Sequence, residues 1–173
     1  MFFLYGFTII NVLEECLIIA QAYSANNLAQ AKYGYLKLNG VTVWQASFLG
    51  EHPNNRGAAT FVVDTSSCTL QQVRNYDTYA DIGAAARLRD YIGGLSDGTV
   101  LVAVSCDEAS IYLDKAEATL TGLGADVSDV EYRGAWAFLA VIGDQSKTVL
   151  DKELTEIPAT ERQPVITVSM SGT

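Results

Sequence analysis

The sequence predicts a single mixed α/β domain with strands enough for two sheets and with two principal helices. Its 173 residues suffice for one domain with a sizeable core. Residues 100–104 read Val-Leu-Val-Ala-Val, an unbroken apolar run that is typical of a central strand covered on both faces. Apolar residues recur at helical spacing on either side of this run, over residues 81–92 and 112–123. These two segments are therefore expected to be helices that flank the central strand.

Both expected helices end at glycines. Asp81 is a candidate N-terminal cap of the first helix, and Gly93-Gly94 is expected to end it. The apolar pattern of the second helix stops at Gly122 and Gly124. Because these glycines follow helices instead of preceding them, they are typical of C-terminal caps and do not predict a phosphate-binding loop.

Further apolar runs predict strands on both sides of this central unit. They lie at residues 33–38, 41–46, 58–64, 70–78, 135–143 and 165–168. Asn39-Gly40 separates the first two runs and is the strongest short signal for a hairpin. The run at 70–78 alternates loosely, so we expect it to pair with its predecessor and to have one wetter face. The run at 135–143 is expected beside the central strand, and the last run at a sheet edge.

The first 25 residues differ from the rest of the chain. Met1–Leu13 is almost wholly apolar, and Glu14-Glu15 interrupts the run before it resumes. One interpretation is a signal peptide with a small-residue cleavage site within residues 22–25, although no basic residues precede the apolar run. The other is an ordered hydrophobic helix. A stable membrane span is not expected, because a span needs about 20 apolar residues and the two glutamates make burial in lipid costly.

The expected organisation has three parts. A possible signal or atypical hydrophobic N-terminus, the domain itself and a C-terminal tail occupy residues 1–25, 33–154 and 155–173.

The charge balance argues against several classes of partner. Lys and Arg number 11 against 20 Asp and Glu, which gives a formal net charge of −9. Nucleic acids and anionic membranes bind clustered basic residues, so neither is an expected partner. His52 is the single histidine and the three cysteines have no Cys-x-x-Cys spacing, so we expect no metal and no cofactor. Cys68 and Cys106 are either paired with each other or both small buried thiols.

Four short motifs occur in a recognisable order. They are Asn55-Arg56-Gly57, Tyr76-Asp77-Thr78-Tyr79, Asp97 to Ala103 followed by Asp107-Glu108, and Tyr132 to Leu139. In this order and with these gaps they resemble the ILEI/PANDER domain family over residues 36–154. The resemblance implies two β-sheets flanked by two principal helices, and a location outside the cell or in the lumen of the secretory pathway.

Two departures from the family pattern are evident. Where the family has an aromatic-Arg-Asp-Ser-Trp pattern, this chain has Gly134 and Ala135 in place of the aspartate and the serine. A polar site centred on that aspartate is therefore expected to be weakened. The cysteines of the secreted members have no evident counterparts here, so the family's disulfides cannot be transferred to this chain.

The resemblance also implies a recognition role. The domain occurs in cytokine-like secreted factors and in glycan-handling cell-surface proteins, so we expect a non-catalytic domain that binds carbohydrate or glycoprotein. The alternative is a secreted cytokine-like ligand that engages a protein receptor. An exposed aromatic residue beside Arg133 would favour sugar binding, a contiguous apolar patch would favour protein binding, and close carboxylates in a cleft would favour catalysis.

The candidate ligand-binding residues come from the same motifs. They are Arg133, Trp136, Asp77 and Asp107. The guanidinium of Arg133 suits bidentate contact with vicinal sugar hydroxyls, or else a structural ion pair with one of the two aspartates. Trp136 can stack on the apolar face of a sugar, although a tryptophan within an apolar strand is more often part of the core.

Catalysis is the weakest hypothesis. Asp77 with Asp107-Glu108 could form the carboxylate pair of a glycosidase, but Asp77 equally suits a turn before a helix and Glu108 a solvated loop. Cys106 as a nucleophile would need a base, and His52 is the only imidazole. We therefore expect the domain not to be an enzyme.

Overall fold

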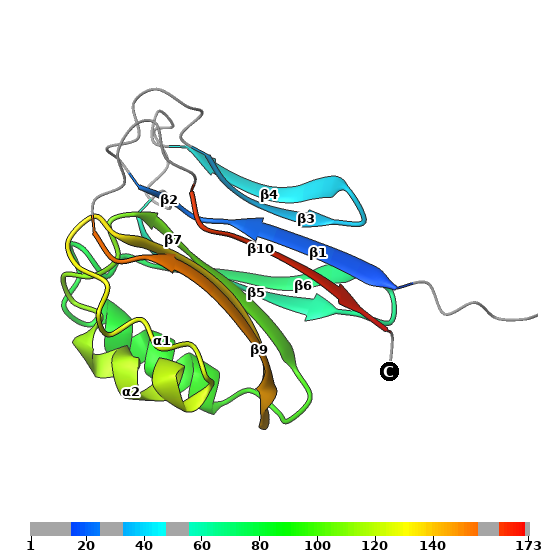
Figure 1. Cartoon of the computed structure of the whole chain (residues 1–173). Helices are drawn as coiled ribbons and strands as arrows, with labels where there is room; N and C mark the ends of the chain where they lie inside the picture. Colours follow the sequence, from blue (N-terminus) through cyan, green and yellow to red (C-terminus); the bar gives the residue numbers. More distant parts are fainter. Residues whose placement is uncertain (1–14, 25–32, 48–55, 156–162, 172–173) are drawn as a thin grey trace, which may run out of the picture.

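The computed structural model describes residues 15–24, 33–47, 56–155 and 163–171 as a three-layer α/β domain. Two mainly antiparallel sheets pack face to face, and both helices cover the outer face of the larger sheet (Figure 1). The predicted fold class, a mixed α/β domain with two sheets and two principal helices, is therefore confirmed.

The strands and helices follow one another in the order that the sequence predicted, with three further strands: β1 and β2 before the first predicted strand, and β9 between the last two. The strands are β1 (Cys16–Gln21), β2 (Tyr23–Ser24), β3 (Tyr33–Leu38), β4 (Val41–Ser47), β5 (Gly57–Asp64), β6 (Thr69–Tyr76), β7 (Val100–Asp107), β8 (Ala135–Val141), β9 (Asp144–Glu153) and β10 (Val165–Met170). The helices are α1 (Ala84–Gly93) and α2 (Asp114–Gly122). The smaller sheet has the order β10-β1-β3-β4, and the larger has the order β6-β5-β7-β8-β9, with β2 parallel to the end of β7.

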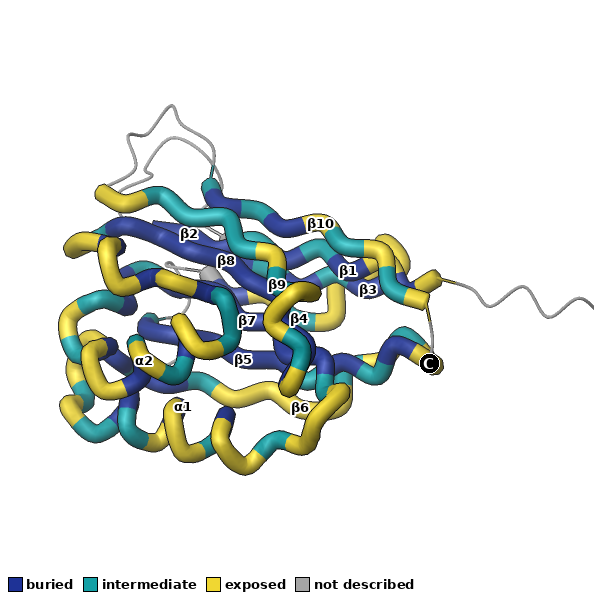
Figure 2. The backbone as a smooth tube through the Cα atoms, turned by 60° about the horizontal axis from the view of Figure 1, so that its bottom comes forward, coloured by how far each residue is buried: buried dark blue, intermediate teal, exposed yellow. Residues whose placement is uncertain are grey.

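Strand β7 is the buried centre of the larger sheet. Every residue from Val100 to Cys106 is buried, as the apolar run predicted, and Figure 2 shows β5, β7 and β8 as the dark-blue interior. Val102 belongs to the cluster between the two sheets, whereas Leu101 belongs to the cluster under the helices. Helices therefore cover only one face of the central strand, and the second sheet covers the other.

The predicted turns and caps are largely present. Asn39 and Gly40 both have positive φ, 48° and 80°, as the tight hairpin between β3 and β4 requires. Gly94 is the C-cap of α1, and its backbone N–H donates to the carbonyl of Asp90. The helix begins at Ala84, not at the predicted Asp81, whose carboxylate instead accepts a hydrogen bond from the backbone N–H of Gly83 at 2.8 Å.

The structure corrects the interpretation of the N-terminal segment over its described part. Residues 16–21 form β1, which lies between β10 and β3 in the smaller sheet. Its inward-facing residues Cys16, Ile18 and Ala20 are fully buried. In the structure this stretch is a strand and not the helix of the second interpretation. Residues 1–14 lie outside the described residues.

The C-terminal tail is likewise part of the domain. Strand β10 pairs with β1 along its whole length, from Cys16 opposite Met170 to Gln21 opposite Val165. It is the edge strand that the sequence predicted, but the domain that it completes spans more than the expected residues 33–154. Within the described residues, no helix is long and apolar enough to cross a membrane.

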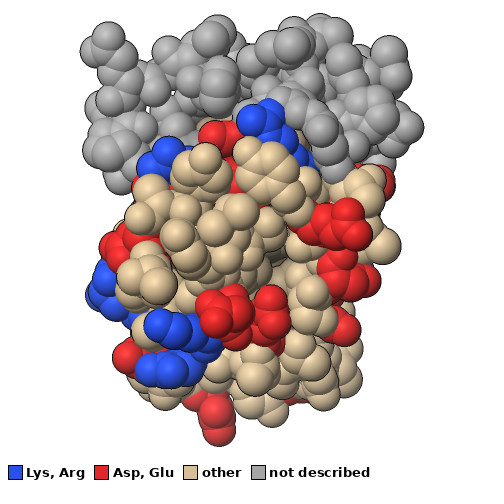
Figure 3. Space-filling model, turned by 90° about the vertical axis from the view of Figure 1, so that its left-hand side faces the viewer, with Lys and Arg blue, Asp and Glu red and all other residues tan. Residues whose placement is uncertain are grey.

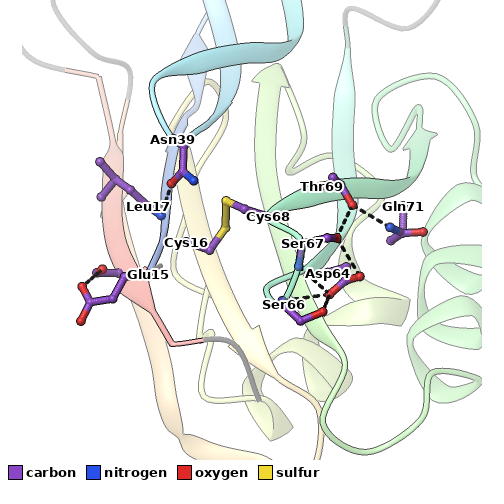
Figure 4. The surroundings of a disulfide bond; sticks show 11 residues. Glu15, Cys16, Leu17, Asn39, Asp64, Ser66, Ser67, Cys68, Thr69 and Gln71 are labelled. Atoms are coloured by element: carbon purple, nitrogen blue, oxygen red, sulfur yellow. Dashed lines mark hydrogen bonds between the residues drawn. A yellow bond between two sulfur atoms is a disulfide. The ribbon is translucent and has the colours of Figure 1, made fainter. Parts of the chain in front are cut away.

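A disulfide joins the two sheets. Cys16 of β1 is bonded to Cys68 in the turn before β6, with their Cα atoms 5.1 Å apart (Figure 4). Hydrogen bonds from Ser66 and Ser67 hold the same turn and lower the pKa of Asp64 to about 2. This cross-link fixes the first strand of the domain against the larger sheet.

The expected alternatives for the cysteines need one correction. Cys68 does not pair with Cys106, because they lie toward opposite ends of the larger sheet: Val63, near the turn with Cys68, pairs with Val100, whereas Cys106 pairs with Gly57. Cys106 is a free, fully buried thiol, and burial raises its pKa.

We expect replacement of both bonded cysteines, Cys16→Ala with Cys68→Ala, to lower the free energy of unfolding substantially. The cross-link spans 52 residues of sequence, and the chain-entropy relation for such a loop gives about 4 kcal/mol. Chemical denaturation with and without reductant measures this loss. Cys106→Ala is the control, because it deletes a buried sulfur without opening a cross-link and should cost only about 1 kcal/mol. Equal losses in the two proteins would contradict a stabilising role of the disulfide.

Candidate functional site

The motif residues of four separate segments meet at one end of the larger sheet. Strand β5 begins at Gly57 and β8 begins at Ala135, whereas β6 ends at Tyr76 and β7 ends at Asp107. Because neighbouring strands here are antiparallel, these starts and ends lie side by side. We call this region the sheet-end site. It comprises Arg56, Asp77, Tyr79, Asp107, Glu108, Tyr132 and Arg133.

Gly57 allows the start of β5 to lie close to the end of β6. Its φ is +88°, and a Cβ atom at this position would lie 2.0 Å from the carbonyl oxygen of Tyr76. Only glycine fits both the left-handed backbone and this contact. The backbone N–H of Gly57 also donates to the carbonyl of Glu108 at 3.0 Å, which ties the start of β5 to the loop after β7.

Arg56 and Asp77 form a bidentate ion pair at this point. Arg56 Nε donates to Asp77 Oδ1 at 3.0 Å, and its terminal nitrogen lies 2.6 Å from Oδ2. The guanidinium lies 4.7 Å from the ring centroid of Tyr79, whose side chain is partly exposed. Arg56 is therefore the partner of Asp77, although its place in the first motif did not predict this role.

The ionisation of Asp77 follows from these contacts. Partial burial tends to raise the pKa of its carboxyl group, but the hydrogen bonds from Arg56 and from the backbone N–H of Ala80 outweigh it. The net result is a pKa below the usual value for aspartate. The same pair raises the pKa of Arg56, and the nearby charge of Asp107 adds to this increase.

Glu108 connects the loop after β7 to the segment before β8. Its side chain is 2% exposed, so the expectation of a solvated loop residue was wrong. One carboxylate oxygen accepts hydrogen bonds from the backbone N–H and the hydroxyl of Ser110, at 2.5 and 2.6 Å. The other accepts a hydrogen bond from the backbone N–H of Arg133. Since the backbone carbonyl of Glu108 also holds Gly57, this one residue links three of the four segments.

Tyr132, which is exposed, and Arg133, which is half-buried, form a pair beside Glu108. Arg133 has a φ of +63°, a left-handed conformation that is unusual for a residue with a side chain. Its bond to Glu108 holds the backbone in this conformation. The guanidinium lies 5.2 Å from the ring centroid of Tyr132, which is 48% exposed. The exposed ring of Tyr132 therefore lies beside the guanidinium of the half-buried Arg133.

Gly134 explains one departure from the family pattern. A Cβ atom at this position would lie 2.6 Å from Val130 Cγ1 and 2.7 Å from the carbonyl oxygen of Glu153. The backbone of this chain therefore has no room for an aspartate side chain at residue 134. The family's aspartate-centred polar site cannot form here without a backbone shift.

The remaining candidate binding residues, Trp136 and Asp107, differ in how far they are buried. Trp136 is 1% exposed and its ring stacks on Phe138, with the centroids 5.7 Å apart, in the cluster under the helices. It is a core residue and presents no ring face to a ligand. Asp107 is partly exposed, ends β7 and has a φ of +57°. The structure thus brings Arg133, Asp77 and Asp107 to the same sheet end and places Trp136 beneath it.

The geometry does not resemble an acid–base pair. A general acid needs a raised pKa, whereas that of Asp77 is lowered, and Glu108 is buried with both oxygens hydrogen-bonded. Among the described residues, no group of three or more His, Cys, Asp or Glu side chains is placed to hold a metal ion.

We expect Glu108→Ala to destabilise the domain by about 3–5 kcal/mol, because a buried acceptor of three hydrogen bonds is lost and its donors are left without partners. Glu108→Gln keeps the shape but turns an amide N–H₂ toward a donor, so it should cost about 1–3 kcal/mol. Urea unfolding gives both values. Glu131→Gln, an exposed change of the same kind two residues before Arg133, should have little effect. A wild-type midpoint for Glu108→Ala would exclude the connecting role.

Comparisons with known proteins support the assignment of these motifs. A family model described as interleukin-like EMT inducer matches residues 56–144. The cell migration-inducing and hyaluronan-binding protein of Homo sapiens is 29% identical over 147 residues, which cover 75% of this chain and 11% of that protein. Its namesake from Mus musculus is 28% identical over 156 residues, which cover 80% of this chain and 12% of that protein. The chain therefore spans only about a tenth of the length of these relatives.

Proposed function

This chain belongs to the interleukin-like EMT inducer family, and from that premise we propose that it is a non-catalytic recognition domain that binds carbohydrate or glycoprotein. The sheet-end site is the proposed binding surface. The proposed location is outside the cell or in the lumen of the secretory pathway.

Two exposed tyrosines, each beside an arginine guanidinium, are the observation that carries the proposal. Tyr132, 48% exposed, lies beside the guanidinium of Arg133, and Tyr79, 37% exposed, lies beside that of Arg56. Aromatic rings offer an apolar surface to the carbon face of a sugar, and guanidinium groups donate in a planar fork that suits neighbouring hydroxyls. An exposed aromatic residue beside Arg133 is the feature that was expected to favour sugar binding.

The rigidity of the site supports the same function. Glu108 accepts hydrogen bonds from the backbone N–H groups of Gly57 and Arg133, and these bonds, with the close approach at Gly57, hold the backbone that carries Arg56 and Arg133. A surface that is already ordered loses less conformational entropy when it binds. Weak contacts, such as those to sugar hydroxyls, therefore contribute more to the net binding free energy on an ordered surface than on a flexible one.

Two further observations support the location and the ligand class. The disulfide between Cys16 and Cys68 is typical of proteins that fold in an oxidising compartment. The relatives are named for hyaluronan binding, a carbohydrate-binding property, and for inducing cell migration. Both names describe binding or signalling.

A cytokine-like ligand for a protein receptor is the second candidate. The outer face of the smaller sheet is not covered by another layer of the described structure, and Leu17 of β1 and Val43 of β4 are exposed there at 36% and 38%. Apolar side chains on an open sheet face can contact a protein partner.

A glycan array probed with the whole chain separates the two candidates. We expect binding to a defined subset of glycans, and we expect Tyr132→Ala to abolish most of it without a change in melting temperature. The matched control is Val41→Ala, another exposed apolar residue, which lies beside the β3–β4 hairpin. If the folded wild-type chain binds no glycan, the carbohydrate proposal is wrong and the receptor-ligand candidate takes its place.

A further inference from the structure

We infer that the sheet-end site selects uncharged sugars over acidic ones, and therefore prefers neutral glycans to polyanions of the hyaluronan type. This inference rests on the proposed function, because it names the class of sugar that the same site takes. It concerns this chain alone and departs from the property for which the relatives are named.

The first reason is the charge of the site itself. Its carboxylates outnumber its guanidiniums: Asp77, Asp107, Glu108 and the neighbouring Glu131 against Arg56 and Arg133. Figure 3, which faces this end of the molecule, shows acidic and basic side chains interspersed among uncharged ones, without an extended basic patch on the described surface. Polyanions bind through several clustered cations, and no such cluster is present on the described surface of this end.

The second reason is that the charge of Arg56 is already matched. Its guanidinium is held by Asp77 through two contacts, of 3.0 and 2.6 Å, and Asp107 lies close enough to act on the same group. An incoming carboxylate would have to compete with both aspartates for Arg56. A hydroxyl group would not, because it can donate to an aspartate oxygen while it accepts from the guanidinium.

The third reason is the charge of the whole chain. Its formal net charge is −9, so an anionic polysaccharide is repelled before it reaches the site. This repulsion is screened over about 8 Å at physiological ionic strength. Salt should therefore weaken the discrimination against acidic sugars but leave the affinity for neutral sugars almost unchanged.

Matched pairs of glycans test the inference directly. The probes are N-acetyllactosamine and its sialylated form, hyaluronan hexasaccharide and its methyl ester, and a high-mannose glycan and its phosphorylated form. Each pair differs in charge on a common carbohydrate skeleton. Affinities for the immobilised whole chain are measured at 50 and 500 mM NaCl. We expect the neutral member of any bound pair to bind at least about tenfold more tightly at low salt, and the ratio to fall at high salt.

The outcomes are distinguishable. Tighter binding of the acidic member, with affinity that falls as salt rises, would overturn this inference and leave the carbohydrate proposal intact. No binding in any pair, together with an empty array, would overturn both.

An Asp107→Asn variant provides a second, independent readout. Asparagine tolerates the left-handed backbone at this position, so the substitution removes one charge without the strain of a larger change. At low salt, we expect the ratio of the affinity for the neutral glycan to the affinity for the acidic glycan to fall by about threefold, because one repulsive carboxylate is gone. An unchanged ratio would show that the carboxylates of the site do not set its preference.

Discussion

A chain that begins at Asn26 should not form the native domain. It lacks β1, which pairs with β10 on one side and with β3 on the other, so the smaller sheet would be split in two. It also lacks the fully buried side chains of Cys16, Ile18 and Tyr23, and the disulfide to Cys68. Each of these losses alone costs several kcal/mol, which is comparable with the total stability of a domain of this size.

Circular dichroism and thermal melting of the shortened chain give the measurement. We expect no cooperative transition, whereas a chain that begins at Glu15 keeps every described strand and should unfold cooperatively. If the chain from Asn26 melts at the wild-type temperature, residues 16–24 are a dispensable leader and the structural assignment of β1 is wrong.

Val102→Asp should unfold the domain. Val102 is fully buried between the two sheets, where a carboxylate would have no partner and no water. The cost of an unpaired charge in such a position is comparable with the whole stability of a domain, about 5–15 kcal/mol, so we expect most molecules to be unfolded.

Val73→Asp is a closely matched control. Val73 and Val102 are both register partners of Phe61, one on each side of it, so they occupy the same row of the larger sheet. Val73 is 46% exposed because β6 is an edge strand, and its replacement should leave a cooperative transition. Denaturant titration of the two variants checks this. Near wild-type stability of Val102→Asp would show that the central strand is not buried on both faces.

The fold was predictable where sequence pattern and tertiary environment coincide. Residues 100–104 are apolar because they are covered on both sides, and Asn39-Gly40 is the turn that a two-residue hairpin needs. Strand β1 was missed because a signal-like apolar run and a well-buried strand have the same composition. Buried and more exposed residues alternate along Cys16–Gln21, but the sequence does not show this, because the outward residues Leu17 and Ile19 are apolar as well.

The candidate site was predictable only in part, for a different reason. Motif order named Asp77, Asp107 and Arg133 as candidates, and the structure places all three at one end of the larger sheet, but motif order could not say which charges pair across strands. The partner of Asp77 is Arg56, and the signal that could have found it was its place beside Gly57 in the first motif. Glu108 could not be recognised, because its burial depends on two loops that are far apart in sequence.

Arg133 offers the sharpest test of glycan recognition at the sheet end. Arg133→Ala removes the guanidinium, and Arg133→Lys keeps the charge but loses the planar fork. Both variants retain a side chain at the left-handed position and the backbone hydrogen bond to Glu108, so the backbone should be little affected. Arg89→Ala, which removes an exposed arginine paired with Asp90 on α1, is the matched control.

The decisive measurement is the affinity of these variants for the best glycan from the array, taken together with their melting temperatures. We expect Arg133→Ala and Arg133→Lys to lose about 1.5–3 kcal/mol of binding free energy, which is about 10- to 150-fold in Kd, at nearly unchanged melting temperature. Arg89→Ala should bind like the wild type. Unchanged affinity with a lowered melting temperature for Arg133→Ala would contradict recognition and leave Arg133 as a structural residue.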